Sequence, residues 1–180
     1  MACVRRLSWM NAALLVLAVG LVSLQRLLEL GLSRRHERIL RARGAVEWGR
    51  EHYPLMVGLR VLWLLSTLVE GLLRGPSIPA WWPIPLVLFL FAQLLRYWAI
   101  LSLGEHWNTR VLVVPGVRLV RRGPYRYFPH PNYVVVVVEI ATFPLIFGAW
   151  VTALVFTALN AALLYVRIRT ENRALKELAG

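Results

Sequence analysis

The sequence contains no aspartate, and its only cysteine is Cys3. All nine acidic residues are glutamates. The missing aspartate excludes aspartyl-phosphate pumps, intramembrane aspartyl proteases and EF-hand calcium loops, because each of these needs an aspartate side chain. A single cysteine excludes an internal disulfide framework and any zinc or iron–sulfur site built from several cysteines.

The chain is unusually apolar for its length. Hydrophobic residues make up 58% of the 180 residues and the mean hydropathy is +0.58, whereas soluble domains contain roughly 45–50% apolar residues. This composition indicates an integral membrane protein. The length predicts a single membrane domain over residues 1–180, with three spans in residues 1–103 and a loop, a helical hairpin and a tail in residues 104–180.

Five apolar segments are bounded by charge or proline: residues 9–30, 54–74, 83–103, 133–148 and 150–166. A helix that crosses a bilayer needs about 20 apolar residues, so the fourth segment is short. Its 16 residues reach only about 24 Å as a helix. The predicted fold is therefore an all-α integral membrane bundle of about five transmembrane helices, with a C-terminal helical hairpin and an ordered cytoplasmic loop.

Positive charge gathers on one side of this predicted bundle. Arginines crowd the segments after the first and third spans and the C-terminal tail, and the net charge is +12. The distribution predicts an external N-terminus and a cytoplasmic C-terminus. The same charge is expected to contact anionic lipid headgroups, and no nucleic-acid partner is expected. No small-residue cleavage site follows the first span, which is interpreted as a retained anchor.

Several ionisable residues fall inside predicted spans, in the half that faces the cytoplasm, among them Arg26, Arg60, Arg96 and Glu139. Each is a functional hypothesis, because a charge at membrane depth is costly unless it is paired or solvated. The structural alternative is that the arginine stems reach the interface, that Arg26 pairs with Glu29, and that Glu139 pairs with Arg96 or Arg60. The sequence leaves both interpretations open.

The segment 104–133 reads GEHWNTRVLVVPGVRLVRRGPYRYFPHPNY and carries the densest set of candidate functional residues. Its proline and glycine pairs mark successive turns, which predicts an ordered loop. His130 stands between Pro129 and Pro131, and the two prolines restrict the backbone on both sides of the imidazole. His130 is thus a candidate binding residue. The four histidines of the chain are not expected to form a metal site.

Arg167 and Glu171 lie four residues apart where the last span continues into the tail. This spacing places both on one helix face. As a simple ion pair they would contribute about a few tenths of a kcal/mol. Beside the loop of His130 they would instead suit the two ends of a zwitterionic ligand.

The order of these motifs, GPYRYFPHPNY followed by an apolar hairpin and RIRTENRAL, resembles the C-terminal half of the isoprenylcysteine carboxyl methyltransferase family, which is related to the phospholipid methyltransferases. The resemblance covers about residues 104–178. It implies that S-adenosylmethionine is the cofactor, in a cytoplasmic pocket over the hairpin, with a side tunnel to the bilayer for a lipid acceptor. The HPNY and WNTR stretches look most like a bacterial branch, whose acceptors are lipophilic small molecules, long-chain polyketide pyrones among them.

The resemblance also implies roles for individual residues. The residues expected to bind the cofactor are Val117, Arg118, Leu119, Val120, Tyr125, His130, Pro131, Asn132, Tyr133 and Glu171. Arg167 is expected to face the acceptor, and Arg167, His130 and Glu171 form the expected catalytic set. The chain departs from the family pattern at two positions. Pro129 replaces an arginine, for which Arg126 or Arg122 would substitute, and Asn172 replaces a second glutamate.

The predicted function is S-adenosylmethionine-dependent transfer of a methyl group to a carboxyl or hydroxyl oxygen of a lipophilic acceptor, in a bacterial cytoplasmic membrane. The first alternative is an NADPH-dependent sterol or steroid reductase, a class that shares HPNY but places a glutamate where this chain has Val136. The second alternative is a non-enzymatic scaffold or transporter, which would leave the His130 loop without a function. The sequence leaves open the acceptor and the oligomeric state.

Overall fold

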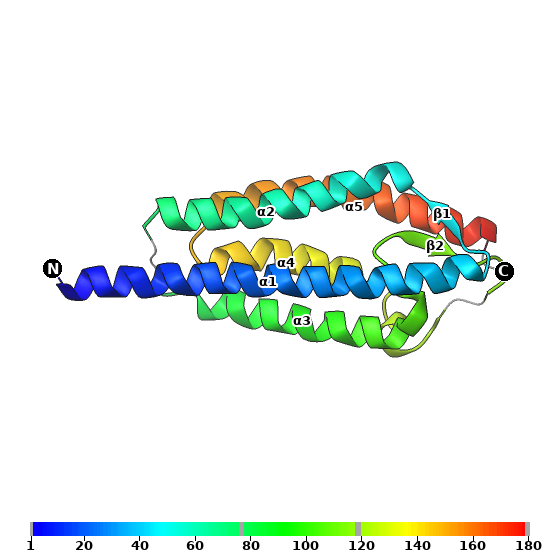
Figure 1. Cartoon of the computed structure of the whole chain (residues 1–180), viewed down its shortest axis with the longest axis horizontal. Helices are drawn as coiled ribbons and strands as arrows, with labels where there is room; N and C mark the ends of the chain where they lie inside the picture. The colour runs from blue at the N-terminus through cyan, green and yellow to red at the C-terminus, as the bar shows by residue number, and fades with distance from the viewer. Residues whose placement is uncertain (1, 76–77, 118–119, 179–180) are drawn as a thin grey trace.

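The computed structural model describes residues 2–75, 78–117 and 120–178. Helices run along one long axis, with the N-terminus at one end and the C-terminus at the other (Figure 1). The α-helices are α1 (Ala2–Ala42), α2 (Tyr53–Leu73), α3 (Pro83–Leu103), α4 (Pro131–Ile146) and α5 (Trp150–Leu178). Short 3₁₀ helices are η1 (Arg50–His52), η2 (Gly104–His106) and η3 (Gly123–Arg126), and two strands are β1 (Val46–Trp48) and β2 (Val111–Val113).

Four of the described helices are long and apolar enough to cross a membrane, namely α1, α2, α3 and α5. The chain is therefore an integral membrane protein, and the predicted all-α bundle is confirmed. The bounds of α3 are those expected from the sequence. By contrast, α1 and α5 extend well beyond their apolar segments, because their polar ends continue as helix with ion pairs such as Arg41 to Glu37 at 2.7 Å.

The short helix α4 lies in the centre of the bundle, packed against α3 and α5. Its side chains Val135, Glu139 and Ile140 are fully buried. The indole N–H of Trp63 on α2 donates to the carbonyl oxygen of Ile140 at 3.2 Å. Because most of α4 is buried within the protein, its 16 residues need not match the thickness of a bilayer.

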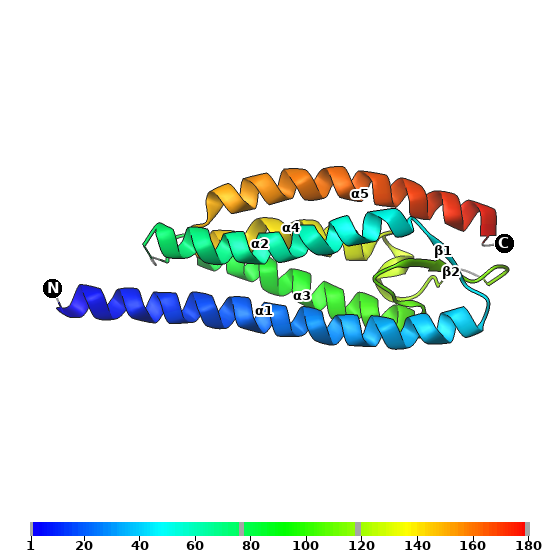
Figure 2. The same ribbon diagram turned by 45° about the horizontal axis from the view of Figure 1, so that its top comes forward.

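The two strands were not expected from the sequence. β1 pairs with β2 in antiparallel register, with Val46 opposite Val113 and Trp48 opposite Val111. Figure 2 shows the pair at the end of the molecule where α1 and α5 end. We call this the strand end. The pair ties the segment between α1 and α2 to the segment between α3 and α4.

Buried and partly buried charges form a cluster inside the bundle, made of Arg26, Arg60, Arg96, Glu29 and Glu139. Glu139 accepts a hydrogen bond from Nη1 of Arg60 at 2.8 Å and another from Arg96, and Nη2 of Arg26 lies 3.4 Å away. Arg26 also pairs with Glu29 at 2.8 Å. The predicted ion pairs are confirmed, and the cluster joins four helices across the bundle.

At the opposite end of the bundle, Glu70 forms an ion pair with Arg74, at 2.7 Å. Glu70 also accepts hydrogen bonds from the backbone N–H groups of Val151 and Thr152, at 3.1 and 2.7 Å. These donors belong to the first turn of α5, where free N–H groups favour a carboxylate. The carboxylate of α2 therefore caps α5.

Candidate functional site

A cavity of about 770 Å³ opens at the strand end. Its walls come from β2 and its flanks, from η3 and the residues that follow it, from the first turn of α4 and from the polar part of α5. The residues used below that line it are Trp107, Asn108, Arg110, Val117, Val120, Arg121, Tyr125, Pro129, His130, Asn132, Tyr133, Arg167, Glu171, Asn172 and Lys176. Segments far apart in the sequence thus meet around one space.

His130, Tyr133 and Glu171 form a connected group in this cavity. The hydroxyl of Tyr133 donates to Glu171, and the rings of His130 and Tyr133 stack with centroids 5.2 Å apart. Nε2 of His130 donates to Oδ1 of Asn172 at 3.0 Å, and Nδ1 lies 3.8 Å from Oε1 of Glu171. The sequence predicted that Pro129 and Pro131 restrict the backbone on both sides of His130. The contacts of the imidazole agree with this prediction, and His130 directly precedes the first turn of α4.

Arg167 uses its three nitrogens on three different segments. Nε donates to the hydroxyl of Tyr133 at 3.0 Å, Nη1 to the sulfur of Met56 at 2.9 Å, and Nη2 to the carbonyl oxygen of Thr109 at 2.6 Å. None of these acceptors is charged. Arg167 and Glu171 are therefore joined through the Tyr133 hydroxyl.

The WNTR stretch is fastened to α1. Backbone N–H of Thr109 donates to the Ser33 hydroxyl at 3.0 Å, and the side-chain amide of Asn108 donates to the Ser33 carbonyl oxygen at 3.0 Å. Nδ1 of the buried His36 bonds to the Trp107 carbonyl oxygen at 2.8 Å, so Nδ1 carries the proton. These contacts hold the cavity wall that contains Arg110.

The η3 segment docks closely onto the end of α3. Nε of Arg122 donates to the Ser102 carbonyl oxygen at 2.7 Å. At Gly123, φ is +59°, and a Cβ atom there would lie 1.9 Å from Oγ of Ser102. Only glycine fits this approach. The contact fixes Tyr125 at the cavity.

Charge in the cavity is mainly positive. Four basic residues line the cavity, together with one carboxylate, that of Glu171; the basic residues are Arg110, Arg121, Arg167 and Lys176. Burial, with the nearby Glu171, raises the pKa of the Tyr125 phenol, so it stays a neutral hydrogen-bond donor. The site suits a ligand that carries anionic groups together with one positive group.

A protein-family model matches the C-terminal half of this chain, and individual proteins match it along most of its length. The model of the isoprenylcysteine carboxyl methyltransferase (ICMT) family matches residues 85–177. The chain belongs to the ICMT family. The uncharacterized protein YpbQ of Bacillus subtilis (strain 168) is 44% identical over 161 residues, which are 89% of this chain and 96% of that relative.

A second relative is an uncharacterized protein of Haemophilus influenzae (strain ATCC 51907 / DSM 11121 / KW20 / Rd), 29% identical over 154 residues, or 85% of this chain and 90% of the relative. No solved structure matches the chain with significance. ICMT is a methyltransferase family, so membership supports an enzyme.

Most of the residues expected from the ICMT resemblance lie around the cavity. These are Val117, Val120, Tyr125, His130, Asn132, Tyr133, Arg167 and Glu171. Arg118 and Leu119 lie outside the described residues. Pro131, the first residue of α4, is fully buried and is absent from the described cavity lining.

The two departures from the ICMT pattern have local consequences. Asn172 takes the hydrogen bond from His130. Arg126 or Arg122 was expected to replace the charge missing at Pro129, but neither is among the described lining residues, whose arginines are Arg110, Arg121 and Arg167. Arg122 is bound to Ser102 and Arg126 is exposed.

Two residues that support the site were not predicted from the sequence. Glu47 on β1 holds Arg110 through a hydrogen bond of 2.5 Å, and Met56 on α2 contacts Arg167. Both lie outside the segment that the ICMT model matches. The only signal in the sequence was that Glu47 is one of few carboxylates in an arginine-rich segment.

Proposed function

We propose that this chain is an S-adenosylmethionine-dependent methyltransferase that transfers a methyl group to a carboxyl or hydroxyl oxygen of a lipophilic acceptor. The observation that carries the proposal is the meeting of the His130 loop with Arg167 and Glu171 around one cavity. Membership of the ICMT family gives the reaction class. The acceptor is expected to be lipophilic because the enzyme lies in a membrane.

The cavity fits the proposed cofactor in size and chemistry. Its volume of about 770 Å³ lies within the roughly 300–1,000 Å³ of small-molecule sites. An amino-acid carboxylate would suit Arg121 or His130, and the amino or ribose hydroxyl groups would suit Glu171. The neutral Tyr125 and Tyr133 rings would tolerate a sulfonium.

When bound, S-adenosylmethionine supplies a methyl group on a positively charged sulfur, and the bonding electron pair returns to that sulfur as the new oxygen–carbon bond forms. The residues of this chain then mainly position and desolvate the reactants. Arg167 would orient an acceptor oxygen. For a carboxylate acceptor no proton has to be removed; for an enol or phenol, Glu171 or His130 would accept the proton.

We further propose that the strand end faces the cytoplasm of a bacterial cell. The arginines of α1 beyond residue 33 and those of α5 lie toward this end, and basic residues favour the cytoplasmic side of a membrane. Single-cysteine variants at the exposed Arg38 and Trp9 test the orientation in intact cells. An impermeant thiol reagent should label position 9; labelling of position 38 instead would reverse the orientation.

Calorimetry on the purified protein in detergent tests the cofactor. We expect S-adenosylhomocysteine to bind with micromolar affinity and NADPH not to bind. The reverse result would favour the reductase alternative and overturn the proposal.

A second experiment measures transfer of labelled methyl from S-adenosylmethionine to lipids extracted from membranes that contain the protein. His130→Ala and Glu171→Ala should each abolish labelling while the protein stays folded. Glu177→Ala, an exposed glutamate on the same helix as Glu171, is the matched control and should keep full labelling. Full activity in either of the first two variants would remove that residue from the site.

A further inference from the structure

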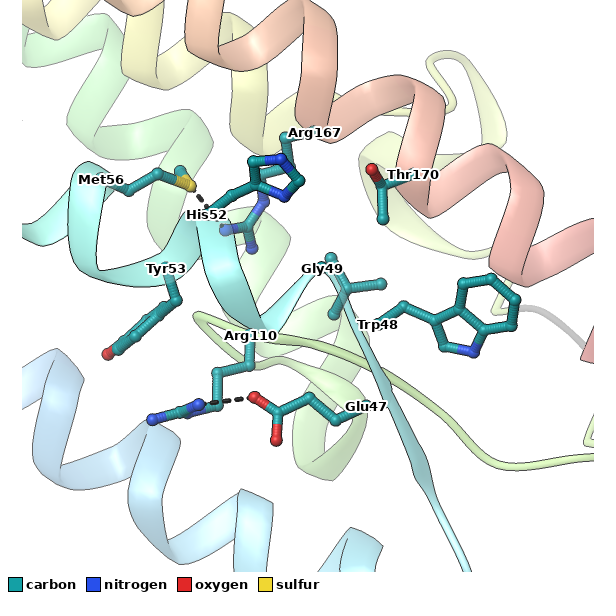
Figure 3. A pocket seen from close by; sticks show the side chains of 10 residues that line it. Glu47, Trp48, Gly49, His52, Tyr53, Met56, Arg110, Arg167 and Thr170 are labelled. Carbon is teal, nitrogen blue, oxygen red and sulfur yellow. Dashed lines mark hydrogen bonds and ion pairs between the residues drawn. The ribbon is translucent and has the colours of Figure 1, made fainter.

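Behind Arg167 lies a second, smaller hollow of about 10 Å³, which we call the rear hollow (Figure 3). Its lining is Glu47, Trp48, Gly49, His52, Tyr53, Met56, Arg110, Val111, Arg167 and Thr170. Its volume is close to that of a single water site. Arg110, Val111 and Arg167 line both this hollow and the large cavity, so they form the wall between the two spaces.

The two arginines of this wall differ in how their charge is balanced. Arg110 has two carboxylate partners, Glu47 at 2.5 Å and Glu37 at 3.4 Å. Arg167 has no carboxylate within ion-pair distance among the residues that the structure describes. The charge of Arg167 is therefore available to a ligand, whereas that of Arg110 is already paired.

One donor of Arg167 is bound to a weak acceptor. Nη1 donates to the thioether sulfur of Met56 at 2.9 Å (Figure 3), while Nε and Nη2 donate to the oxygens of Tyr133 and Thr109. A thioether sulfur is a weak, uncharged acceptor. A hydrogen bond from a guanidinium to an anionic oxygen is about twice as strong as one between neutral groups. If an anionic oxygen replaced the present acceptor, the hydrogen bond from Nη1 would therefore gain more strength than the hydrogen bond from Nε or Nη2 would gain from the same replacement.

The position and flexibility of Met56 allow its side chain to move away from Arg167. It lies in the first turns of α2, half-buried beside the rear hollow. Its side chain is unbranched and has three rotatable bonds, so it can change rotamer at small cost. The family model, which starts at residue 85, does not include it.

We propose that Met56 is a specificity-determining residue. Its sulfur accepts a hydrogen bond from Nη1 of Arg167, and an anionic oxygen of the acceptor replaces the sulfur as the partner of Nη1. This inference rests on the proposed function. The sulfur binds Arg167 when the acceptor is absent, and the side chain rotates away from Nη1 when the oxygen binds. An acceptor that ends in an ammonium group is rejected, because it cannot accept from Nη1 and brings a like charge to Arg167.

The experiment compares binding of laurate and dodecylamine, which have equal chain length and opposite charge. Affinities are measured by calorimetry on the full chain in nanodiscs of uncharged lipid, with S-adenosylhomocysteine present and empty nanodiscs subtracted. Met56→Leu removes the sulfur with little change of volume. Because a competing hydrogen bond is lost, laurate should bind roughly three- to tenfold more tightly. Dodecylamine binding should not change.

Two further variants sharpen the result. Met56→Gln places a stronger uncharged acceptor beside Arg167, so laurate should bind more weakly than to the wild-type chain. Met10→Leu makes the same substitution as the first variant at an exposed position on α1 and should change nothing. Because the two Met56 variants act in opposite directions, failure of one to fold leaves the other as a test.

Equal laurate affinity in the wild type, Met56→Leu and Met56→Gln would overturn the role of Met56. An equal gain for dodecylamine in Met56→Leu would also overturn it, since that result would mean only that the hollow had widened. Failure of the wild-type chain to bind S-adenosylhomocysteine would instead contradict the proposed function, so the two failures are distinguishable.

Discussion

The hydroxyl of Tyr133 accepts a hydrogen bond from Nε of Arg167 at 3.0 Å, and this hydroxyl in turn donates to Glu171. One phenol thus sets the positions of two residues that lie a helical turn apart on α5. Both residues line the large cavity. Tyr133 is itself buried, which restricts its movement.

We expect Tyr133→Phe to lower methyl transfer by roughly 10- to 100-fold, because hydrogen bonds to charged groups contribute about 1.5–3 kcal/mol. The loss should appear in kcat more than in the KM for S-adenosylmethionine, since the Phe ring still fills the site. Steady-state kinetics with labelled cofactor measure both. Tyr127→Phe, which removes the hydroxyl of an exposed tyrosine, is the control and should behave as wild type. Unchanged kcat in Tyr133→Phe would mean that Arg167 and Glu171 hold their positions without it.

The buried charge cluster gives a prediction about stability. Glu139 is fully buried and faces Arg26, Arg60 and Arg96. Glu139→Gln leaves buried guanidinium groups short of a counter-charge, which costs about 3–5 kcal/mol. We expect a clear fall in the midpoint of thermal denaturation in detergent.

A matched control is Glu105→Gln, since Glu105 pairs with Arg43 at 2.6 Å and both side chains are 50% exposed. A pair of this kind contributes less than about 1 kcal/mol. Equal denaturation midpoints for the two variants would show that the cluster does not stabilise the bundle.

The helices could be predicted from the sequence because the bilayer imposes a length and an apolar composition on each span. The limits of α3 follow from Pro83 and from the change to polar residues after Leu103. The polar ends of α1 and α5 could not be predicted in this way, since their helix is supported by ion pairs and tertiary contacts. The β1–β2 pair was also missed, because each strand has three residues and its partner lies far away in the sequence.

Residues of the candidate site could be predicted only where they belong to one local sequence motif. His130 between two prolines, and the spacing of Arg167 and Glu171, pointed to residues that do line one cavity. The link through Tyr133 and the contact of Met56 with Arg167 depend on how distant helices pack. Sequence spacing carries no information about such contacts, so they needed the structure.

Glu47 gives a prediction about pH. Burial raises the pKa of its carboxyl group, but hydrogen bonds from Arg110 and Arg41 lower it by more, and the net pKa is below the ordinary value. A carboxyl group whose pKa is lowered by folding stabilises the folded state above its unfolded pKa of about 4.3. That stabilisation is lost as the pH falls through the lower, folded-state pKa.

The measurement is the denaturation midpoint of wild type and Glu47→Gln as a function of pH. Near neutral pH the wild type should be more stable, and the difference should shrink below about pH 4 as Glu47 is protonated. Comparison with the variant removes the contribution of other carboxylates. A difference that is constant from neutral to acid pH would contradict the stabilising role of the Glu47 charge.

The last prediction concerns Gly123, which lets η3 approach α3. Gly123 and Gly116 both have positive φ, +59° and +73°, but no atom of the residues that the structure describes lies within 4 Å of a Cβ placed at Gly116. Gly116→Ala should therefore cost only the left-handed backbone energy of roughly 1–2 kcal/mol. Gly123→Ala adds a collision with Ser102, so it should displace the segment that carries Tyr125 and weaken S-adenosylhomocysteine binding.

A second substitution separates the collision from the backbone cost. Ser102→Gly removes both atoms that the new Cβ would meet most closely, Oγ at 1.9 Å and Cβ at 2.8 Å. In the Gly123→Ala background it should restore binding and the denaturation midpoint to the level of Gly116→Ala. If the double variant is no better than Gly123→Ala alone, contact with Ser102 is not what requires glycine at position 123.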